Sequence, residues 1–344
     1  MIRFNNDYNH GAHPRILEAL AKSNTESYGG YGQDIWCEKA AEEIKRCAGC
    51  PDGSVHFLIG GTQANFTVIA AALRPYQGVI SPETGHINAH ETGAVENCGH
   101  KIFALPAKDG KITATQIEKE AETYASSSIK EHIVQPKLVY LSYPTEYGTL
   151  YSKKELEEIY EVCQKYGLFL FIDGARLGYG IGSPEADLTF KDFSALSDVF
   201  TCGGTKCGTL FGEAVVITNH RLKEGFRCFM KQNGAMLAKG WLLGLQFYTL
   251  FQDGLYFEIT KQAVDYAMKI KSAFERKGIS FYAESFTNQQ FVLLNQKQME
   301  KLAENCIFKV DEKVNEQLSC VRFCTSWSTT EEEVNALVTE INKL

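Results

Sequence analysis

The feature that most constrains this fold is an apolar run that ends abruptly in charge. Residues 168–172 read LFLFI and lead directly into Asp173, with Arg176 three residues later. A short apolar run bounded by polar residues is typical of a strand buried on both faces. In an open α/β sheet, ligands bind at the carboxyl ends of the strands, so Asp173 is placed for a site.

A second short apolar run ends in glycines and one lysine. The segment DVFTCGGTKCG carries Lys206, and a lysine in this turn could reach the crevice at Asp173 from a neighbouring strand. An acid, an arginine and a lysine together suggest pyridoxal phosphate chemistry. Lys206 would bond covalently to the cofactor, and Asp173 would keep its pyridine nitrogen protonated.

The segment VHFLIGGTQANFTVIAAAL indicates a strand, a glycine turn at residues 60–63 and a helix to Leu73. Backbone N–H groups at such a helix start face outward and favour an anion, and Thr62 adds a hydroxyl group. The turn lacks the lysine and spacing of a Walker loop and the GxGxxG of a dinucleotide fold. A tight connection that binds no ligand is the alternative interpretation.

Histidines follow the next predicted strand, in GVISPETGHINAHETGA. His86 could stack on a flat cofactor and also carry protons. A structural role is the usual one for a single histidine. His86, His90 and Glu91 also suggest a metal site, but no further cluster of ligands is visible, so we expect no metal.

The remaining pattern alternates strands and helices, which predicts an α/β fold with a largely parallel central sheet. The segment SKKELEEIYEVCQKYG is a clear helix, with Ser152 and Glu155 in capping-box positions and Gly167 after its end. We assign residues 1–254 to an N-terminal arm and a large cofactor-binding domain, and residues 255–344 to a small α+β domain. Within the small domain we expect two short helices between the strands NQQFVLLN and LSCVRFCTSW.

Composition excludes several classes of function. A net charge of −7 without a basic stripe argues against nucleic acid as a partner. The longest strongly apolar piece, residues 240–252, is too short to span a membrane. The start MIRFNNDYNHG does not resemble a signal peptide, and the 11 cysteines are scattered, so we expect a cytoplasmic protein with reduced thiols. The lone CxxC at residues 47–50 is interpreted as ordinary thiols.

Arg322 lies in the predicted strand CVRFCTS beside apolar residues. An arginine there is costly unless it meets an anion, which is either a protein carboxylate or the carboxylate of a substrate.

Taken in order, these motifs resemble the L-threonine aldolase branch of the β-eliminating lyases, which are pyridoxal phosphate enzymes of fold type I. The likeness covers nearly the whole chain. It rests on these segments of the sequence: FNNDYN, GGYGQD, GGTQAN, GHINAHETG, IDGARLG, TKCG and VRFCTSW.

The resemblance implies a role for each matching residue. Lys206 would hold the cofactor covalently, Asp173 would pair with its ring nitrogen and His86 would stack on its ring. The phosphate would be held by Gly61, Thr62, Gln63 and Thr205. The substrate would be held by Arg176, Arg322, Asn6 and Tyr31. Family members place active sites between subunits, so we expect a homodimer or homotetramer.

Two departures from the family pattern stand out. Glu146 in YPTEYG occupies the place of a family histidine, and Leu237 occupies the place of an arginine that reaches a neighbouring subunit's phosphate. Lys231 or Lys239 could substitute for that arginine.

The resemblance implies cleavage of L-threonine, L-allo-threonine or a related β-hydroxy-α-amino acid into glycine and an aldehyde. His86 or Glu146 would be the base, and His86 is slightly preferred. The main alternative is β-elimination to pyruvate and ammonia, which needs the same cofactor residues. A racemase, an aminotransferase and a non-catalytic ligand sensor are weaker alternatives. A nicotinamide dehydrogenase is weaker still, because Gly178, Gly180 and Gly182 have the wrong spacing.

Overall fold

The computed structural model describes residues 1–344 and contains a central sheet of seven strands in the order β2-β8-β7-β6-β5-β3-β4. Its strands are β2 (Ser54–Leu58), β3 (Gln77–Pro82), β4 (Ile102–Leu105), β5 (Gln135–Ser142), β6 (Phe169–Asp173), β7 (Val199–Gly203) and β8 (Glu213–Ile217). The pairs from β4 through β7 are parallel, and β8 is antiparallel to both of its neighbours. The prediction of a largely parallel α/β sheet is confirmed.

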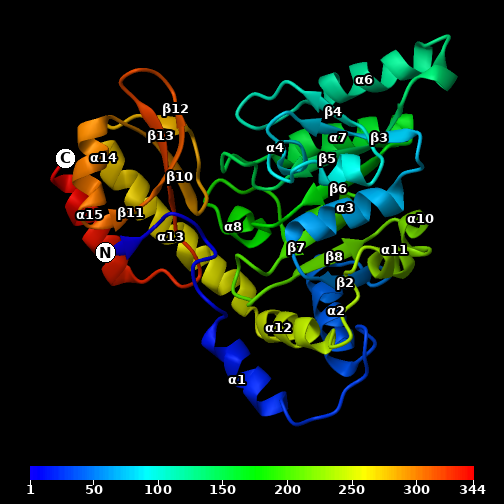
Figure 1. The fold of residues 1–344 in the computed structure, drawn as a ribbon, viewed down its shortest axis with the longest axis horizontal. Coiled ribbons are helices and arrows are strands. Elements are labelled where there is room, and N and C mark those ends of the chain that lie inside the picture. Colours follow the sequence, from blue (N-terminus) through cyan, green and yellow to red (C-terminus); the bar gives the residue numbers. More distant parts are fainter.

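Helices cover both faces of this sheet (Figure 1). They are α1 (Pro14–Ser23), α2 (Ile35–Ala48), α3 (Gly61–Ala72), α4 (His86–Ala89), α5 (Ala94–Asn97), α6 (Ala114–Ser126), the 3-10 turn η1 (Lys130–His132), α7 (Lys153–Tyr166), α8 (Leu177–Ile181), α9 (Phe190–Ala195), α10 (His220–Lys223), α11 (Phe226–Gln232) and α12 (Trp241–Phe251). Side chains alternate between the two faces along each strand. On β8, Val215 packs in the cluster that includes α3, whereas Val216 packs in the cluster that includes α2 and α12. The sheet is therefore buried on both sides.

The local signals in α7 act as the sequence suggests. The Ser152 hydroxyl accepts a hydrogen bond from the backbone N–H of Glu155, and the Glu155 carboxylate accepts one from the N–H of Ser152. Gly167 ends the helix with φ of 63°, a left-handed conformation that favours glycine. This fixed end brings the chain directly into β6, the strand that carries Asp173.

The C-terminal unit has its own antiparallel sheet, in the order β12-β13-β10-β9. Its elements are α13 (Leu255–Arg276), β9 (Phe281–Ala283), β10 (Gln289–Leu294), α14 (Gln296–Ala303), β11 (Cys306–Ile307), β12 (Lys309–Lys313), β13 (Ser319–Cys324) and α15 (Glu331–Asn342). One of the two expected short helices is present as α14, but the prediction of a second helix is wrong. Residues 309–313 form an exposed edge strand, where charged side chains leave no hydrophobic period to read.

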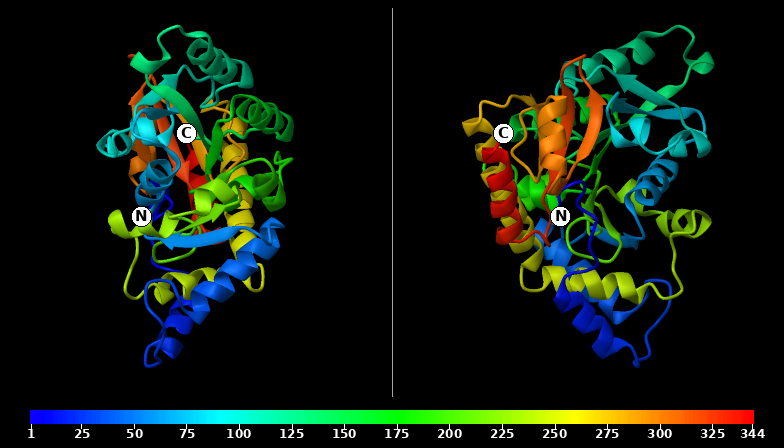
Figure 2. Two further views of the ribbon diagram at one scale, coloured as in Figure 1. Left: turned by 90° about the vertical axis from the view of Figure 1, so that its right-hand side faces the viewer. Right: turned by 60° about the vertical axis from the view of Figure 1, so that its left-hand side comes forward.

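The N-terminal arm begins in the small unit. Strand β1 (Ile2–Arg3) pairs in parallel with β11, and Phe4 is 1% exposed in the core of the small unit. The N and C marks lie near each other in Figures 1 and 2. Residues 2–4 of the arm therefore pack with the small unit, which the sequence did not reveal because two residues of strand carry too weak a pattern to show their partner.

Helix α13 joins the two units without an abrupt boundary. Its first half, from Leu255 to Val264, packs in the large core, and Ile270, Ala273 and Phe274 pack in the small one. The boundary at residue 255 stays a prediction. None of the helices has both the length and the apolar character needed to cross a membrane.

Candidate active site

The carboxyl ends of β5, β6 and β7 bring the predicted site residues together. Asp173 ends β6, Lys206 follows β7, and the loop after β5 carries Glu146. One cavity is lined by Gly61, His86, Ser142, Pro144, Thr145, Glu146, Asp173, Ala175, Arg176 and Lys206. The parallel sheet therefore gathers side chains from five separate segments at a single edge.

Asp173 is buried and well supplied with hydrogen-bond donors. Its Oδ2 accepts bonds from the Tyr140 hydroxyl at 2.6 Å and from the Asn65 Nδ2 at 2.8 Å. Its Oδ1 accepts a bond from the backbone N–H of Ala175 at 2.9 Å. These contacts fix the carboxylate in place before any ligand binds.

The pKa of Asp173 reflects two opposing effects. Burial raises the pKa, but the charge of His86 and the hydrogen bonds from Tyr140 and Asn65 outweigh it, so the net shift is downward. Burial and the nearby carboxylate raise the pKa of Tyr140, which keeps its hydroxyl proton as a donor. Asp173 is therefore an anion at neutral pH.

His86, the first residue of α4, is held by a carboxylate that the sequence had associated only with a metal. Its Nδ1 lies 2.7 Å from Oε1 of Glu91, whose side chain is fully buried. Burial lowers the pKa of His86, but the bond to Glu91 and the charge of Asp173 raise it more. Asn65 Nδ2 bridges Glu91 Oε1 and Asp173 Oδ2, each at 2.8 Å. One buried amide therefore links the two carboxylates.

Glu146 contacts the backbone of His86, whereas Glu91 contacts its ring. Its Oε1 accepts bonds from the Ser142 hydroxyl at 2.6 Å and from the backbone N–H of His86 at 2.9 Å. Burial raises the pKa of Glu146 above its ordinary value, although the Ser142 bond opposes this. Its Oε2 takes part in neither of these bonds.

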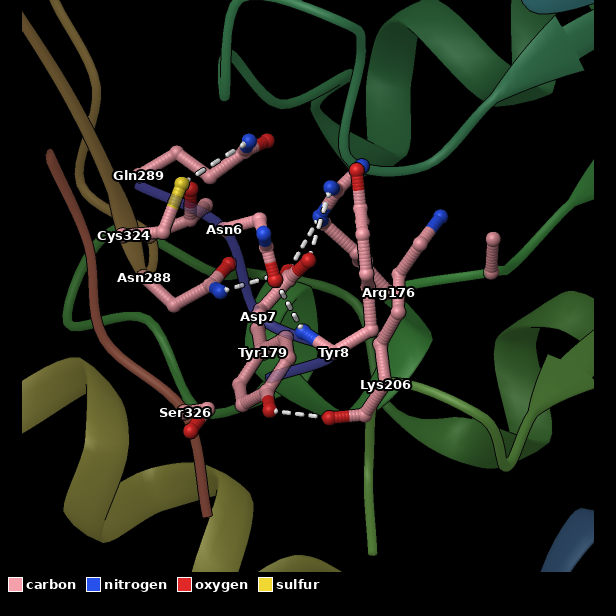
Figure 3. A network of polar contacts seen from close by, with 12 residues as sticks. Asn6, Asp7, Tyr8, Arg176, Tyr179, Lys206, Asn288, Gln289, Cys324 and Ser326 are labelled. Carbon is pink, nitrogen blue, oxygen red and sulfur yellow. Dashed lines mark hydrogen bonds and ion pairs between the residues drawn. The ribbon is translucent and has the colours of Figure 1, made fainter. Parts of the chain in front are cut away.

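Arg176 has a partner that the sequence did not reveal. Its Nε and Nη2 contact the two oxygens of Asp7 at 2.6 and 3.0 Å, and Asn288 Nδ2 also donates to Asp7 Oδ2 at 2.9 Å. Figure 3 shows Asp7 of the N-terminal arm between Arg176 of the large unit and Asn288 of the small unit. Burial raises the pKa of Asp7, but the charge and hydrogen bonds of Arg176 have the larger effect and lower the pKa to about 2. Asp7 occupies one edge of the guanidinium, which leaves Nη1 outside the pair.

Arg322 lies in a neighbouring cavity of 340 Å³ that shares Glu146 with the first one and also contains His90. Its Nε is 3.4 Å from Asp311 Oδ2 but is buried without a hydrogen-bond partner. Asn6 uses its side chain in a local turn, where Oδ1 accepts from the N–H of Tyr8. Arg176 therefore lines the same cavity as Lys206, whereas Arg322 lines the neighbouring cavity.

The glycine turn forms the open end of the site. Helix α3 begins at Gly61, and a Cβ atom built at Gly60 or Gly61 would meet no atom within 4 Å. The side chain of Gln63 is turned away, since its Nε2 donates to the carbonyl of Asn233, so only its backbone can face a ligand. Thr205 is placed by Gly212, whose N–H donates to its hydroxyl at 3.0 Å.

Lys206 lies between these two ends. Burial and the charge of Arg176 lower the pKa of its amine, which favours the neutral nucleophile. The Tyr179 hydroxyl donates to the Lys206 carbonyl at 2.6 Å and fixes the backbone at this position. Sequence reasoning missed Tyr179, although a tyrosine within the glycine-rich segment after Asp173 was a visible signal.

Tyr31 does not reach the site within its own chain. It is 46% exposed with φ of 60°, and it lines a different cavity together with Leu237 and Arg227. The Lys231 ammonium lies over the Tyr31 ring, 4.7 Å from its centroid.

Comparison with known proteins identifies the family. A family model described as beta-eliminating lyase matches residues 10–304. The chain belongs to the beta-eliminating lyase family. The family that the motifs suggested is thus confirmed.

Relatives within the beta-eliminating lyases share nearly the full length of the chain. It is 30% identical to the low specificity L-threonine aldolase of Pseudomonas aeruginosa, over 98% of this chain and 96% of that protein. It is 42% identical to a solved structure of Leishmania major threonine aldolase, with a TM-score of 0.96 over 100% of this chain and 99% of that one. A more distant structure, aspartate aminotransferase from Thermus thermophilus with maleate, has 14% identity and a TM-score of 0.69 over 100% of this chain and 91% of that one, and shows the fold alone.

The site residues fit pyridoxal phosphate, the cofactor that this family implies. An anionic Asp173 suits a protonated ring nitrogen, and Lys206 is an amine of lowered pKa at the same cavity. The space in front of Gly60 and Gly61 lies at the start of a helix of 12 residues, where N–H groups favour a phosphate.

Proposed function

We propose that this beta-eliminating lyase family member is a pyridoxal phosphate-dependent aldolase. It cleaves L-threonine, L-allo-threonine or a related β-hydroxy-α-amino acid into glycine and an aldehyde. The observation that supports this most is the single cavity that joins Lys206, Asp173, His86, Glu146 and Arg176. The identity to two threonine aldolases over nearly the whole chain supports the same reaction.

Each residue near the cofactor has a defined task. When bound, pyridoxal phosphate supplies an electron sink next to the α-carbon of the amino acid. Lys206 holds it covalently, Asp173 keeps a proton on the ring nitrogen, and His86 packs against the ring. The phosphate is held by Gly61, Thr62, the backbone of Gln63, and Thr205.

Two arginines orient the substrate. The Nη1 of Arg176 stays outside the pair with Asp7 and can bind the α-carboxylate. Arg322, whose buried Nε lies 3.4 Å from Asp311 Oδ2 but has no hydrogen-bond partner, binds the same carboxylate from the small unit, and Asn6 supports it. Fixing the carboxylate turns the bond to be broken into the reactive orientation, which is a positioning effect.

Glu146 is the base that takes the β-hydroxyl proton. This replaces His86, which the sequence slightly favoured for that role. Glu146 Oε1 is occupied by Ser142 and His86, while Oε2 takes part in neither bond and its carboxyl lines the cavity of Lys206. His86 binds Glu91 through Nδ1, and its raised pKa favours the charged form, which cannot accept a proton. His86 therefore holds its proton while Glu146 receives one.

The active protein is a homodimer or homotetramer in which Tyr31 completes the site of a neighbouring subunit. The support is that Tyr31 is exposed and lines a cavity without Lys206 in its own chain. All 11 cysteines are free thiols, which supports a reducing compartment such as the cytoplasm.

Product analysis tests the reaction. The purified holoenzyme is incubated with L-threonine, L-allo-threonine and L-serine, and glycine, aldehyde, pyruvate and ammonia are measured. Glycine and aldehyde in equal amounts are expected, and pyruvate with ammonia instead would show β-elimination. Lys206→Ala should lose all turnover.

Glu146→Gln tests the base and should lower kcat by about 10²–10⁴-fold, the usual contribution of a general base. Glu158→Gln, at an exposed position of α7, is the matched control and should leave kcat unchanged. Full activity of Glu146→Gln would return the assignment to His86.

A further inference from the structure

A buried carboxyl group at the open end of the site has no role in the reaction described above. Glu213 is the first residue of β8 and is only 4% exposed. It is paired in register with Leu58 on one side and with Gly203 on the other. Leu58 leads into the Gly60-Gly61 turn, and Gly203 leads into Thr205 and Lys206, so Glu213 lies between the two segments that form the phosphate end.

The side chain of Glu213 points to the same face of the sheet as the start of α3. Alternate residues of a strand share a face, and Val215 and Ile217 pack in the cluster that contains Ala64 and Val68 of α3. Leu58, directly opposite Glu213, packs in the same cluster. Asp173 is on this face too, because Phe171 belongs to the cluster. The carboxyl group is therefore placed under the helix start, where an anion binds.

One oxygen of this carboxyl group is unsatisfied. Glu213 Oε2 is buried and has no hydrogen-bond partner in the chain. Burial raises the pKa of Glu213 to about 8, although the charge of Lys206 and hydrogen bonds from the Thr205 hydroxyl and the Gly204 N–H oppose this. The group is therefore mostly protonated at neutral pH, and a proton on Oε2 is a buried donor without an acceptor, which is costly unless a ligand supplies one.

The neighbouring elements do not supply a cation that would hold Glu213 ionised, apart from Lys206. Asp173 on β6 is an anion, and Cys202 of β7 and Cys207 keep raised thiol pKa values because they are buried. His56 of β2 is kept neutral by burial, with its pKa lowered to about 4. Helix α3 has no titratable residue. Lys206 is thus the cation that opposes the raised pKa of Glu213, and it is the same residue that would hold the cofactor.

We propose that Glu213 donates a hydrogen bond from its neutral carboxyl group to the phosphate of the cofactor. This role rests on the proposed pyridoxal phosphate dependence. A neutral donor suits a phosphate end in which Leu237, instead of an arginine, occurs in the glycine-rich segment. The same group would repel the phosphate once it ionised, so Glu213 makes cofactor retention depend on pH.

The sign of the pH effect follows from the proton that binding requires. Only protein with Glu213 protonated binds the phosphate well. The affinity for pyridoxal phosphate is therefore constant below about pH 8 and falls above that pH. The limiting slope is about tenfold in Kd for each pH unit. Glu213→Gln keeps a neutral donor of the same shape and should bind the cofactor as tightly at neutral pH, without the alkaline loss.

The experiment measures the Kd of pyridoxal phosphate and of pyridoxal, which lacks the phosphate, between about pH 6.5 and about pH 9.5. It uses the full-length wild type, Glu213→Gln, and the exposed control Glu224→Gln. The wild type and the control should lose pyridoxal phosphate at high pH relative to Glu213→Gln. With pyridoxal the three proteins should behave alike.

Other outcomes separate this proposal from the cofactor assignment. Parallel pH profiles for wild type and Glu213→Gln, or weak binding by Glu213→Gln at neutral pH, would overturn the role of Glu213 alone. Failure of the wild type to bind pyridoxal phosphate at any pH would overturn the proposed function as well. If Glu213→Gln does not fold, the wild type still decides. Its preference for pyridoxal phosphate over pyridoxal must shrink above about pH 8, and a constant preference contradicts the proposal.

Discussion

The two ends of the site are built in opposite ways. In the first, which we call the paired half, Asp173, His86 and Arg176 each contact a partner side chain of the chain. In the second, the open half, Gly60 and Gly61 face empty space and Glu213 has an oxygen without a partner. The paired half is thus fixed before a ligand arrives, whereas the open half is completed by the ligand.

This difference predicts which free energy a substitution changes. Changes in the paired half should lower catalysis or folding stability, because they leave buried charges without partners. Changes in the open half should lower cofactor affinity and leave the folded protein intact.

Among the substitutions that compare the two halves, the largest effect should follow from Asp173→Asn, which removes the fixed anion of the paired half. Because a preorganised charge contributes strongly in a buried site, kcat/KM for threonine cleavage should fall by about 10²–10³-fold. Steady-state kinetics at saturating cofactor measure this. Unchanged kcat/KM would contradict the role of Asp173 at the ring nitrogen.

Asp7→Asn should have the next largest effect, on folding. Breaking a buried ion pair typically costs about 3 kcal/mol in the free energy of unfolding. Asp7 has its pKa lowered to about 2, so the stabilisation is present above the ordinary Asp pKa and is lost as pH falls towards about 2. Urea unfolding, measured at pH values between about 2 and the ordinary Asp pKa, gives this loss in the free energy of unfolding.

Asp253→Asn is the matched control for Asp7→Asn. Asp253 pairs with Arg15, but its side chain is 62% exposed. An exposed pair contributes at most about 1 kcal/mol, so the control should unfold nearly as the wild type does. Equal losses in the two variants would mean that the Asp7 pair is no stronger than a surface contact.

Glu91→Gln should have a smaller effect, on His86. The bond to Glu91 helps to raise the pKa of His86, so removing the carboxylate should lower that pKa. Since His86 holds its proton in the reaction, the alkaline limb of the kcat/KM profile should move to lower pH. The rate at neutral pH should fall by roughly tenfold, as expected for one hydrogen bond to a charged group. A profile that keeps its alkaline limb would contradict the assignment.

Gly61→Ala should have the smallest effect and should separate the two halves most clearly. The added methyl group meets no protein atom, and alanine stabilises a helix by up to about 1 kcal/mol over glycine. Thermal unfolding without cofactor should therefore be unchanged or slightly improved, while the Kd of pyridoxal phosphate rises. Reduced stability without cofactor would show that the open half is packed against something else.

The sequence predicted best what depends on local pattern. Asp173 and Lys206 follow apolar runs that could be read as buried strands, and the parallel sheet then placed both at one edge. The helix from Lys153 to Tyr166 was predictable because its cap is encoded within four residues.

What the sequence did not predict is partnership over long distances. Asp7 and Arg176 are separated by 169 positions, and Asn65 lies 108 positions from Asp173. The sequence does contain one signal for Asn65, because it is a polar residue four positions after Gly61 in a mostly apolar helix. Glu91 was noticed as a metal ligand, because spacing alone cannot distinguish a ligand from a hydrogen-bond partner.

The pairing of β1 with β11 also bears on how the chain is made. Ile2 and Arg3 are synthesised 304 residues before their partners Cys306 and Ile307. The opening segment must therefore remain undocked while almost the whole large unit is synthesised, and Asp7 cannot be held by Asn288 before that residue emerges. The complete contact of Asp7 with both Arg176 and Asn288 can therefore form only after residue 288 has been synthesised.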